Sequence, residues 1–146
     1  MPPEVFEMYL QRRVSVLLIF GLSLGVFMVS AGGQKTKRLA VGLWGGSHVN
    51  IDVDSQSAKV EYDCAHGEIH GPLVVDSEGK FEWRGTFTPE RGGPVRAGES
   101  ARSQPATYTG DIKGSTMTLQ LKIGDSDDVE TFTLEKDKPG KLVKCK

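Results

Sequence analysis

The chain has 146 residues, a formal net charge of -1 and hydrophobic residues at 38% of its positions. That length suits one domain plus a targeting segment, and a domain of this size buries about two thirds of its unfolded surface without needing a metal. The near-neutral charge provides no broad electrostatic field for nucleic acid or for an anionic membrane surface. Composition therefore favours small molecules or proteins as partners and excludes nucleic acid.

The first 31 residues have the pattern of an export signal. Arg12 and Arg13 precede an uncharged apolar run, and small side chains follow at positions 29–31. A basic start, a short apolar region and a small-residue cleavage site define a signal peptide, so we predict a hydrophobic helix that is cleaved after Ala31. The alternative is an uncleaved membrane anchor, because the uncharged stretch reaches Gln34 and approaches the roughly 20 residues that span a bilayer. Either way, we expect an exported protein, periplasmic or extracellular, that touches a membrane only through this segment.

Residues 32–39 are expected to form a linker, and residues 40–146 a single β domain. Apolar and polar residues alternate with period two between turn signals, and helical spacing is not sustained anywhere. The pattern predicts an all-β, antiparallel up-and-down meander of about eight strands, including residues 48–53 and 58–64 and a last strand at 141–145. A meander of this length removes its edges by closing into a barrel, and a β-sandwich is the alternative.

Cys64 and Cys145 are the only two cysteines in the chain. In an oxidising compartment a lone pair of cysteines is most often a disulfide, so we predict that these two are bonded. The bond closes a loop of about 80 residues, for which chain-entropy estimates give roughly 4 kcal/mol. It ties the last residues of the chain to an early strand.

Gly42, Leu43 and Trp44 form a Gly-x-Trp pattern on the first strand of the domain. Together with the terminal cysteine, this pattern resembles the opening of the lipocalin-like barrels of the calycin group. The resemblance implies that Trp44 closes one end of an up-and-down barrel, that a disulfide pins the C-terminal segment to the barrel wall, and that the interior has room for an apolar ligand. One departure is that the long connection lies in the middle of this chain rather than after its first strand.

We therefore expect the barrel to bind a small apolar or amphipathic ligand. A barrel of about eight strands is wide enough either to fill itself with side chains or to hold one small molecule. The residues expected to line the site are the aromatic ones Trp44, Tyr62, Trp83, Phe87 and Tyr108, with Phe81, Met117 and Phe132 as further lining or core. No nucleophile elbow and no phosphate-binding glycine loop is evident, so no enzyme activity, catalytic residue or cofactor is predicted.

The segment 88–105 interrupts the strand pattern. It contains three prolines and lacks apolar periodicity, which predicts a long surface loop. Loops of this length often carry recognition. An alternative function is therefore a solid barrel that presents this loop, with Arg91, Arg96 and Arg102, to a protein partner as an inhibitor or envelope interaction module.

The stretch "VEYDCAHGEIHGP", residues 60–72, concentrates two histidines and several carboxylates. His66 and His70, with His48, supply nitrogen ligands of the kind that zinc and copper prefer, which makes metal binding a second alternative function. The glycines and the proline of the stretch, however, predict a turn or an irregular crossing between strands. We therefore predict a structural corner here, with the metal site as the alternative.

Overall fold

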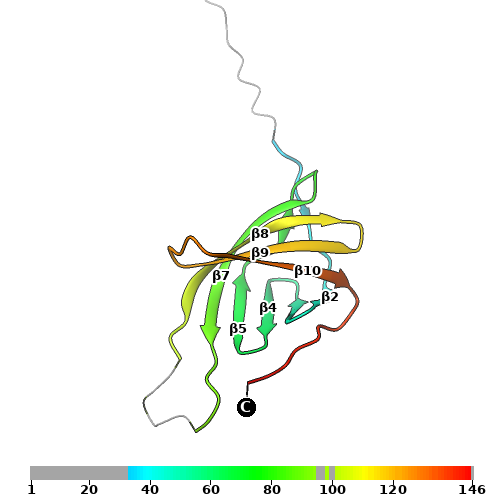
Figure 1. Cartoon of the computed structure of the whole chain (residues 1–146). Coiled ribbons are helices and arrows are strands. Elements are labelled where there is room, and N and C mark those ends of the chain that lie inside the picture. Colours follow the sequence, from blue (N-terminus) through cyan, green and yellow to red (C-terminus); the bar gives the residue numbers. More distant parts are fainter. Residues whose placement is uncertain (1–32, 95–97, 99–100, 146) are drawn as a thin grey trace, which may run out of the picture. The chain divides into compact units, whose positions relative to one another are not determined.

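The computed structural model describes residues 33–94, 98 and 101–145 (Figure 1). The predicted N-terminal helix and its cleavage site lie outside these residues. The described part of the chain forms no helix, and thus none that is long and apolar enough to cross a membrane.

Within the described residues, eight strands close into one antiparallel barrel. In order around the barrel they are β10 (Val129–Lys136), β2 (Gly42–Gly46), β3 (Val49–Val53), β4 (Ser57–Tyr62), β5 (Ala65–His70), β7 (Lys80–Pro89), β8 (Gln104–Lys113) and β9 (Thr116–Ile123). The last strand closes on the first through the pairs Leu134 with Gly46 and Lys136 with Trp44. The predicted closed barrel is confirmed, and the sandwich alternative is wrong because this pairing leaves no open edge.

The barrel interior is apolar because period-two alternation places every second side chain on the inner face. Residues that pair across neighbouring strands lie on the same face, so the register identifies the inward set. Its fully buried members come from all parts of the barrel: Trp44, Val49, Ile51, Val53, Ala58, Val60, Ile69, Tyr108, Met117, Leu119, Leu121 and Leu134. Burial of such side chains is the main favourable term for a sheet that closes on itself.

The up-and-down order gives the barrel two distinct ends. The β2–β3, β4–β5, β7–β8 and β9–β10 connections all lie at one end, which also carries the bond between Cys64 and Cys145. We call this the disulfide end. The β3–β4, β5–β7 and β8–β9 connections lie at the other end, which we call the capped end.

A small ribbon covers the capped end. Strands β1 (Lys37–Arg38) and β6 (Val74–Val75) pair with each other outside the barrel, and the Leu39 amide donates a hydrogen bond of 2.8 Å to the Leu73 carbonyl. Leu73 is buried, and the indole nitrogen of Trp83 donates to the Val74 carbonyl at 2.8 Å. Trp83 also stacks on Phe81, with ring centroids 3.8 Å apart. These contacts fix the ribbon over the barrel and satisfy the polar atom of Trp83.

After β10, residues 137–145 run back along the outside of the barrel to the disulfide end (Figure 1). We call this segment the C-terminal strap. The Lys141 amide donates to the Gly46 carbonyl at 2.9 Å, and the Gly140 amide donates to the Asn50 side chain at 3.1 Å. Gly45 lets the strap approach, because a Cβ at that position would collide with the backbone of residues 138–140.

Two local predictions were wrong. Residues 65–70 are not a turn but strand β5, whose glycine at position 67 faces inward. A Cβ on Gly67 would collide with the Tyr108 hydroxyl and the Thr86 carbonyl, so glycine here permits a close approach rather than a turn. The predicted last strand at 141–145 is the C-terminal strap, which makes one isolated bridge, between Ser47 and Lys141.

Candidate ligand site at the disulfide end

Three aromatic rings meet inside the disulfide end of the barrel. The ring of Tyr62 lies 5.4 Å from that of Phe87 and 5.7 Å from that of Phe132, both in tilted arrangements. Tyr62 is buried, with 6% of its surface exposed, whereas Phe87 and Phe132 are only half-buried. The cluster therefore has a buried centre at Tyr62 and two rings that are partly accessible to solvent.

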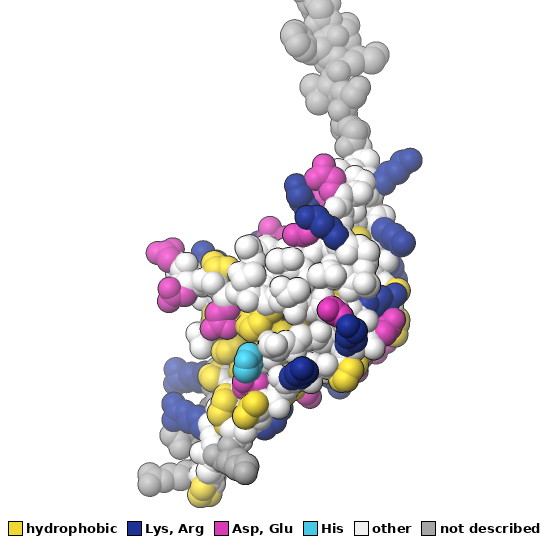
Figure 2. Space-filling model, turned by 45° about the vertical axis from the view of Figure 1, so that its right-hand side comes forward, with side chains coloured by type: hydrophobic (Ala, Val, Ile, Leu, Met, Phe, Trp, Pro, Cys, Tyr) yellow, Lys and Arg dark blue, Asp and Glu magenta, His cyan; other side chains and the backbone are white. Residues whose placement is uncertain are grey.

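A carboxylate belongs to the same inner face. Glu130 on β10 pairs with the buried Leu121, and Phe132, two residues along, pairs with the buried Leu119. Because paired residues share a face, Glu130 lies on the interior side of β10 near its exposed start. Its charge also helps to raise the pKa of Tyr62, after the larger effects of burial and of Tyr108. Figure 2 shows acidic side chains close to a group of hydrophobic ones on the face turned to the viewer.

Within the described residues, two buried donors meet no acceptor at hydrogen-bond geometry: the indole nitrogen of Trp44 and the hydroxyl of Tyr62, whose polar neighbour is the hydroxyl of Tyr108. Burial holds the pKa of Tyr62 far above its usual value, so its phenol stays protonated at every physiological pH. Trp44 is 2% exposed and pairs with Ile51 and Lys136 across its two strand neighbours. Both donors are thus buried in the barrel interior without an acceptor at hydrogen-bond geometry.

Tyr108 lies deeper in the interior, and its hydroxyl already has a hydrogen-bond acceptor. Its hydroxyl donates to the Thr86 carbonyl at 2.7 Å, and the side chain is fully buried. Burial raises the pKa of Tyr108, so it is also neutral. Its hydroxyl oxygen keeps acceptor capacity but has no free proton to donate.

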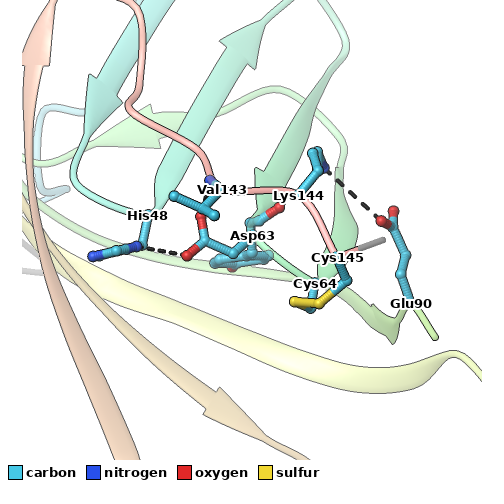
Figure 3. Close-up of a disulfide and its surroundings, with 8 residues drawn as sticks. His48, Asp63, Cys64, Glu90, Val143, Lys144 and Cys145 are labelled. Carbon is cyan, nitrogen blue, oxygen red and sulfur yellow. Dashed lines mark hydrogen bonds and ion pairs between the residues drawn. A yellow bond between two sulfur atoms is a disulfide. The ribbon is translucent and has the colours of Figure 1, made fainter. Parts of the chain in front are cut away.

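A covalent and polar clasp holds the rim beside this cluster (Figure 3). The predicted disulfide between Cys64 and Cys145 is confirmed, with the two Cα atoms 5.2 Å apart. Next to it, the carboxylate of Asp63 accepts hydrogen bonds from the Val143 amide at 2.8 Å and from His48 Nδ1 at 2.6 Å. The Val143 amide, more than His48, holds the pKa of Asp63 below its usual value.

Lys144 continues the clasp on the next position of the strap. Its ammonium donates to the backbone carbonyl of Tyr62 at 2.9 Å and lies 3.9 Å from the Glu90 carboxylate. The strap is therefore fastened to the strand that carries the central ring of the aromatic cluster. This attachment fixes the backbone of Tyr62 from outside the barrel.

The structure does not bring the three histidines together. His48 contacts Asp63, His66 contacts Glu90 at 2.8 Å, and His70 lies 4.0 Å from Glu68. His66 and His70 share the outer face of β5, but four residues along a strand separate them by about 13 Å. In the described residues no group of three or more His, Cys, Asp or Glu side chains is placed to hold a metal ion.

The long loop is shorter than its sequence limits suggested, because β7 runs on to Pro89 and β8 begins at Gln104. It lies at the disulfide end. Arg91 and Arg102 are exposed there, and Arg96 lies outside the described residues.

The aromatic residues predicted to line the site separate into three groups. Tyr62 and Phe87 contact Phe132 at the disulfide end. Trp44 and Tyr108 lie in the barrel interior. Trp83 lies at the capped end. The inward carboxylate of Glu130 was missed. The signal for it was present, because Glu130 alternates in phase with Phe132 and Leu134.

Comparison of the chain with protein families, with curated proteins and with solved structures finds no match. The closed barrel of eight antiparallel strands is compatible with a lipocalin-like fold and with a ligand-binding role. The disulfide is consistent with an oxidising environment.

Proposed function

We propose that this protein binds a small apolar or amphipathic ligand inside the disulfide end of its barrel. The observation that carries the proposal is the buried, unpartnered hydroxyl of Tyr62 behind two half-buried phenylalanine rings. Apolar lining with a few polar groups is the usual composition of small-molecule sites.

Energetics supports the same conclusion. A buried donor without an acceptor costs about 1–3 kcal/mol, and native proteins leave few of them. Two such donors, on Tyr62 and Trp44, occur in the interior of one barrel. A ligand oxygen would satisfy the Tyr62 donor, and the apolar part of the ligand would cover the exposed area of Phe87 and Phe132.

We further propose that the protein acts outside the cytoplasm. Structural disulfides persist in oxidising compartments, and the bond here fastens the C-terminal strap to the rim of the proposed site. The basic and apolar start of the sequence supports export by a signal peptide or an anchor.

Binding is tested with N-phenyl-1-naphthylamine, an uncharged apolar probe whose fluorescence rises when it leaves water. We expect the disulfide-bonded protein to bind the probe, and Phe132→Ala to weaken binding about tenfold, equivalent to about 1.4 kcal/mol. Val129→Ala is the matched control, because Val129 is 51% exposed and lies on the outer side of the same strand. A native protein that leaves the probe unbound, or equal losses in both variants, contradicts the proposal.

Native mass spectrometry of protein exported into an oxidising compartment supplies the complementary measurement. We expect an added mass on the disulfide-bonded chain that disappears in Phe132→Ala but persists in Val129→Ala. A chain that carries no added mass and binds no probe would instead favour the loop at 90–103 as the functional element, as a surface for a protein partner.

A further inference from the structure

We propose that the head group of the ligand is positively charged and that Glu130, with the rings of Tyr62, Phe87 and Phe132, binds it. This inference rests on the proposed function, because it specifies the chemistry of the same site.

The inner face of the described barrel strands has few charged residues. Among the inward register positions of the described strands, the charged residues are Glu130 and Lys136, both on β10. They are six residues apart, or about 20 Å along the strand, so Lys136 belongs to the capped end and does not neutralise Glu130. No cation of the described residues forms an ion pair with Glu130.

The surroundings of Glu130 strengthen its field. The β9–β10 turn that leads into it holds Asp125, Asp127 and Asp128, all exposed. Like charges at one rim repel an anion that approaches and attract a cation, with a strength that falls as salt increases. The β9–β10 turn is therefore acidic, whereas Lys122 on β9 and Arg91 and Arg102 of the long loop are exposed cations at the same end.

Aromatic rings favour the same sign of charge. The face of a phenol or phenyl ring is negative, so it attracts an alkylammonium group and repels a carboxylate. Two of the rings, Phe87 and Phe132, are partly exposed and meet the buried ring of Tyr62 within 6 Å, as their centroid distances of 5.4 and 5.7 Å show. A carboxylate beside such a cluster is an arrangement that suits alkylated ammonium ions.

The Tyr62 hydroxyl is a second, independent pointer to a ligand. It is buried and meets no acceptor at hydrogen-bond geometry, and its pKa is raised by burial, by Tyr108 and, least, by the charge of Glu130 on the same inner face. A ligand whose cation sits by Glu130 can place an oxygen or a hydroxyl at Tyr62. The inferred class is thus an alkylated or primary ammonium compound with an apolar body and a hydrogen-bond acceptor.

Three probes with the same tail test the sign of the charge: decyltrimethylammonium, decanol and decanoate. The affinity of each probe is measured by its displacement of N-phenyl-1-naphthylamine from the protein, at neutral pH and low salt and at concentrations below micelle formation. We expect the ammonium probe to bind at least tenfold more tightly than decanoate, with decanol between them, and the preference to shrink at high salt.

The variant Glu130→Gln tests whether Glu130 causes the preference for the ammonium probe. We expect the ratio of ammonium to decanoate affinity to fall at least fivefold while decanol binding stays within twofold, with a residual preference left by the aromatic rings and the acidic turn. Glu61→Gln is the matched control, because it removes the same charge from an exposed position on β4 next to Tyr62. This control should leave the ratio unchanged.

The outcomes separate this inference from the proposed function. Binding of decanol without any preference for the ammonium probe, or a preference that Glu130→Gln leaves unchanged, overturns the inference and leaves the ligand site in place. Failure of the protein to bind all three probes and N-phenyl-1-naphthylamine overturns both.

Discussion

The two ends of this barrel are built from the same kinds of residue but in opposite ways. At the capped end, Trp83 donates its indole hydrogen to the Val74 carbonyl and stacks on Phe81, and the buried Leu73 lies beneath the covering ribbon. At the disulfide end, the Tyr62 hydroxyl meets no acceptor at hydrogen-bond geometry, and its two neighbouring rings are partly exposed.

The difference suggests that one end of the barrel is built for stability and the other for ligand access. A buried polar atom that finds a backbone partner adds to the stability of the end that contains it, whereas an orphaned one lowers it. The disulfide end recovers stability from outside the barrel, through the C-terminal strap and its bond to Cys64. Its interior can therefore remain incompletely satisfied without unfolding the strands around it.

The largest expected effect comes from breaking the bond that supports the disulfide end. We expect the double variant Cys64→Ser, Cys145→Ser to lose about 4 kcal/mol of unfolding free energy, because the bond closes a loop with a sequence separation of 81 residues. Urea denaturation of the oxidised proteins measures the loss.

Reduction provides the control for this variant. A reducing agent should lower the urea midpoint of the wild-type protein to that of the double variant and leave the variant itself unchanged. Equal midpoints for the variant and the oxidised wild type would mean that the strap contributes nothing through its covalent bond.

A smaller effect compares the two tryptophans, the only two in the chain. Trp83→Phe deprives the Val74 carbonyl of its donor, whereas Trp44→Phe removes a buried nitrogen that has no partner. Both lose similar volume, so we expect Trp83→Phe to cost about 1–3 kcal/mol more than Trp44→Phe. Urea denaturation followed by the remaining tryptophan measures both, and equal costs would show that the hydrogen bond to Val74 does not stabilise the capped end.

The same contrast explains which features the sequence could predict. Period-two alternation and tight turns predicted the all-β class and closure, because both follow from short-range patterns that each strand repeats. The disulfide between Cys64 and Cys145 was predictable because an exported protein with two cysteines offers only one possible pairing. Strand β5 was missed, because the inward glycine at 67 is explained only by Tyr108 and Thr86, residues that are distant in sequence.

The candidate site was less predictable than the barrel for a related reason. Alternation indicated that Tyr62 and Phe87 face inward, but the sequence did not show that Trp83 would lie at the opposite end with its hydrogen bond satisfied. Residues 141–145 of the strap were predicted to be a strand because they follow the turn signal at residues 138–140. The role of the strap depends on Gly45 and Gly140, whose missing side chains let two backbone segments touch.

The smallest expected effect tests the polar part of the clasp through pH. The Val143 amide and then His48, with Lys144 nearby, hold the pKa of Asp63 below its value in the unfolded chain. Ionised Asp63 therefore stabilises the fold at pH values above its unfolded pKa of about 3.9, and this contribution is lost as the pH falls through the lower folded value. We expect the urea midpoint of the wild-type protein to exceed that of Asp63→Asn at neutral pH and the difference to shrink as the pH falls below about 4. The protection factor of the Val143 amide, which corrects for the intrinsic pH dependence of exchange, should fall over the same range, since its acceptor loses charge while the disulfide keeps the strap attached. Parallel pH curves for the two proteins would show that Asp63 holds the strap by geometry alone, and that the disulfide end depends on its covalent bond and backbone contacts rather than on charge.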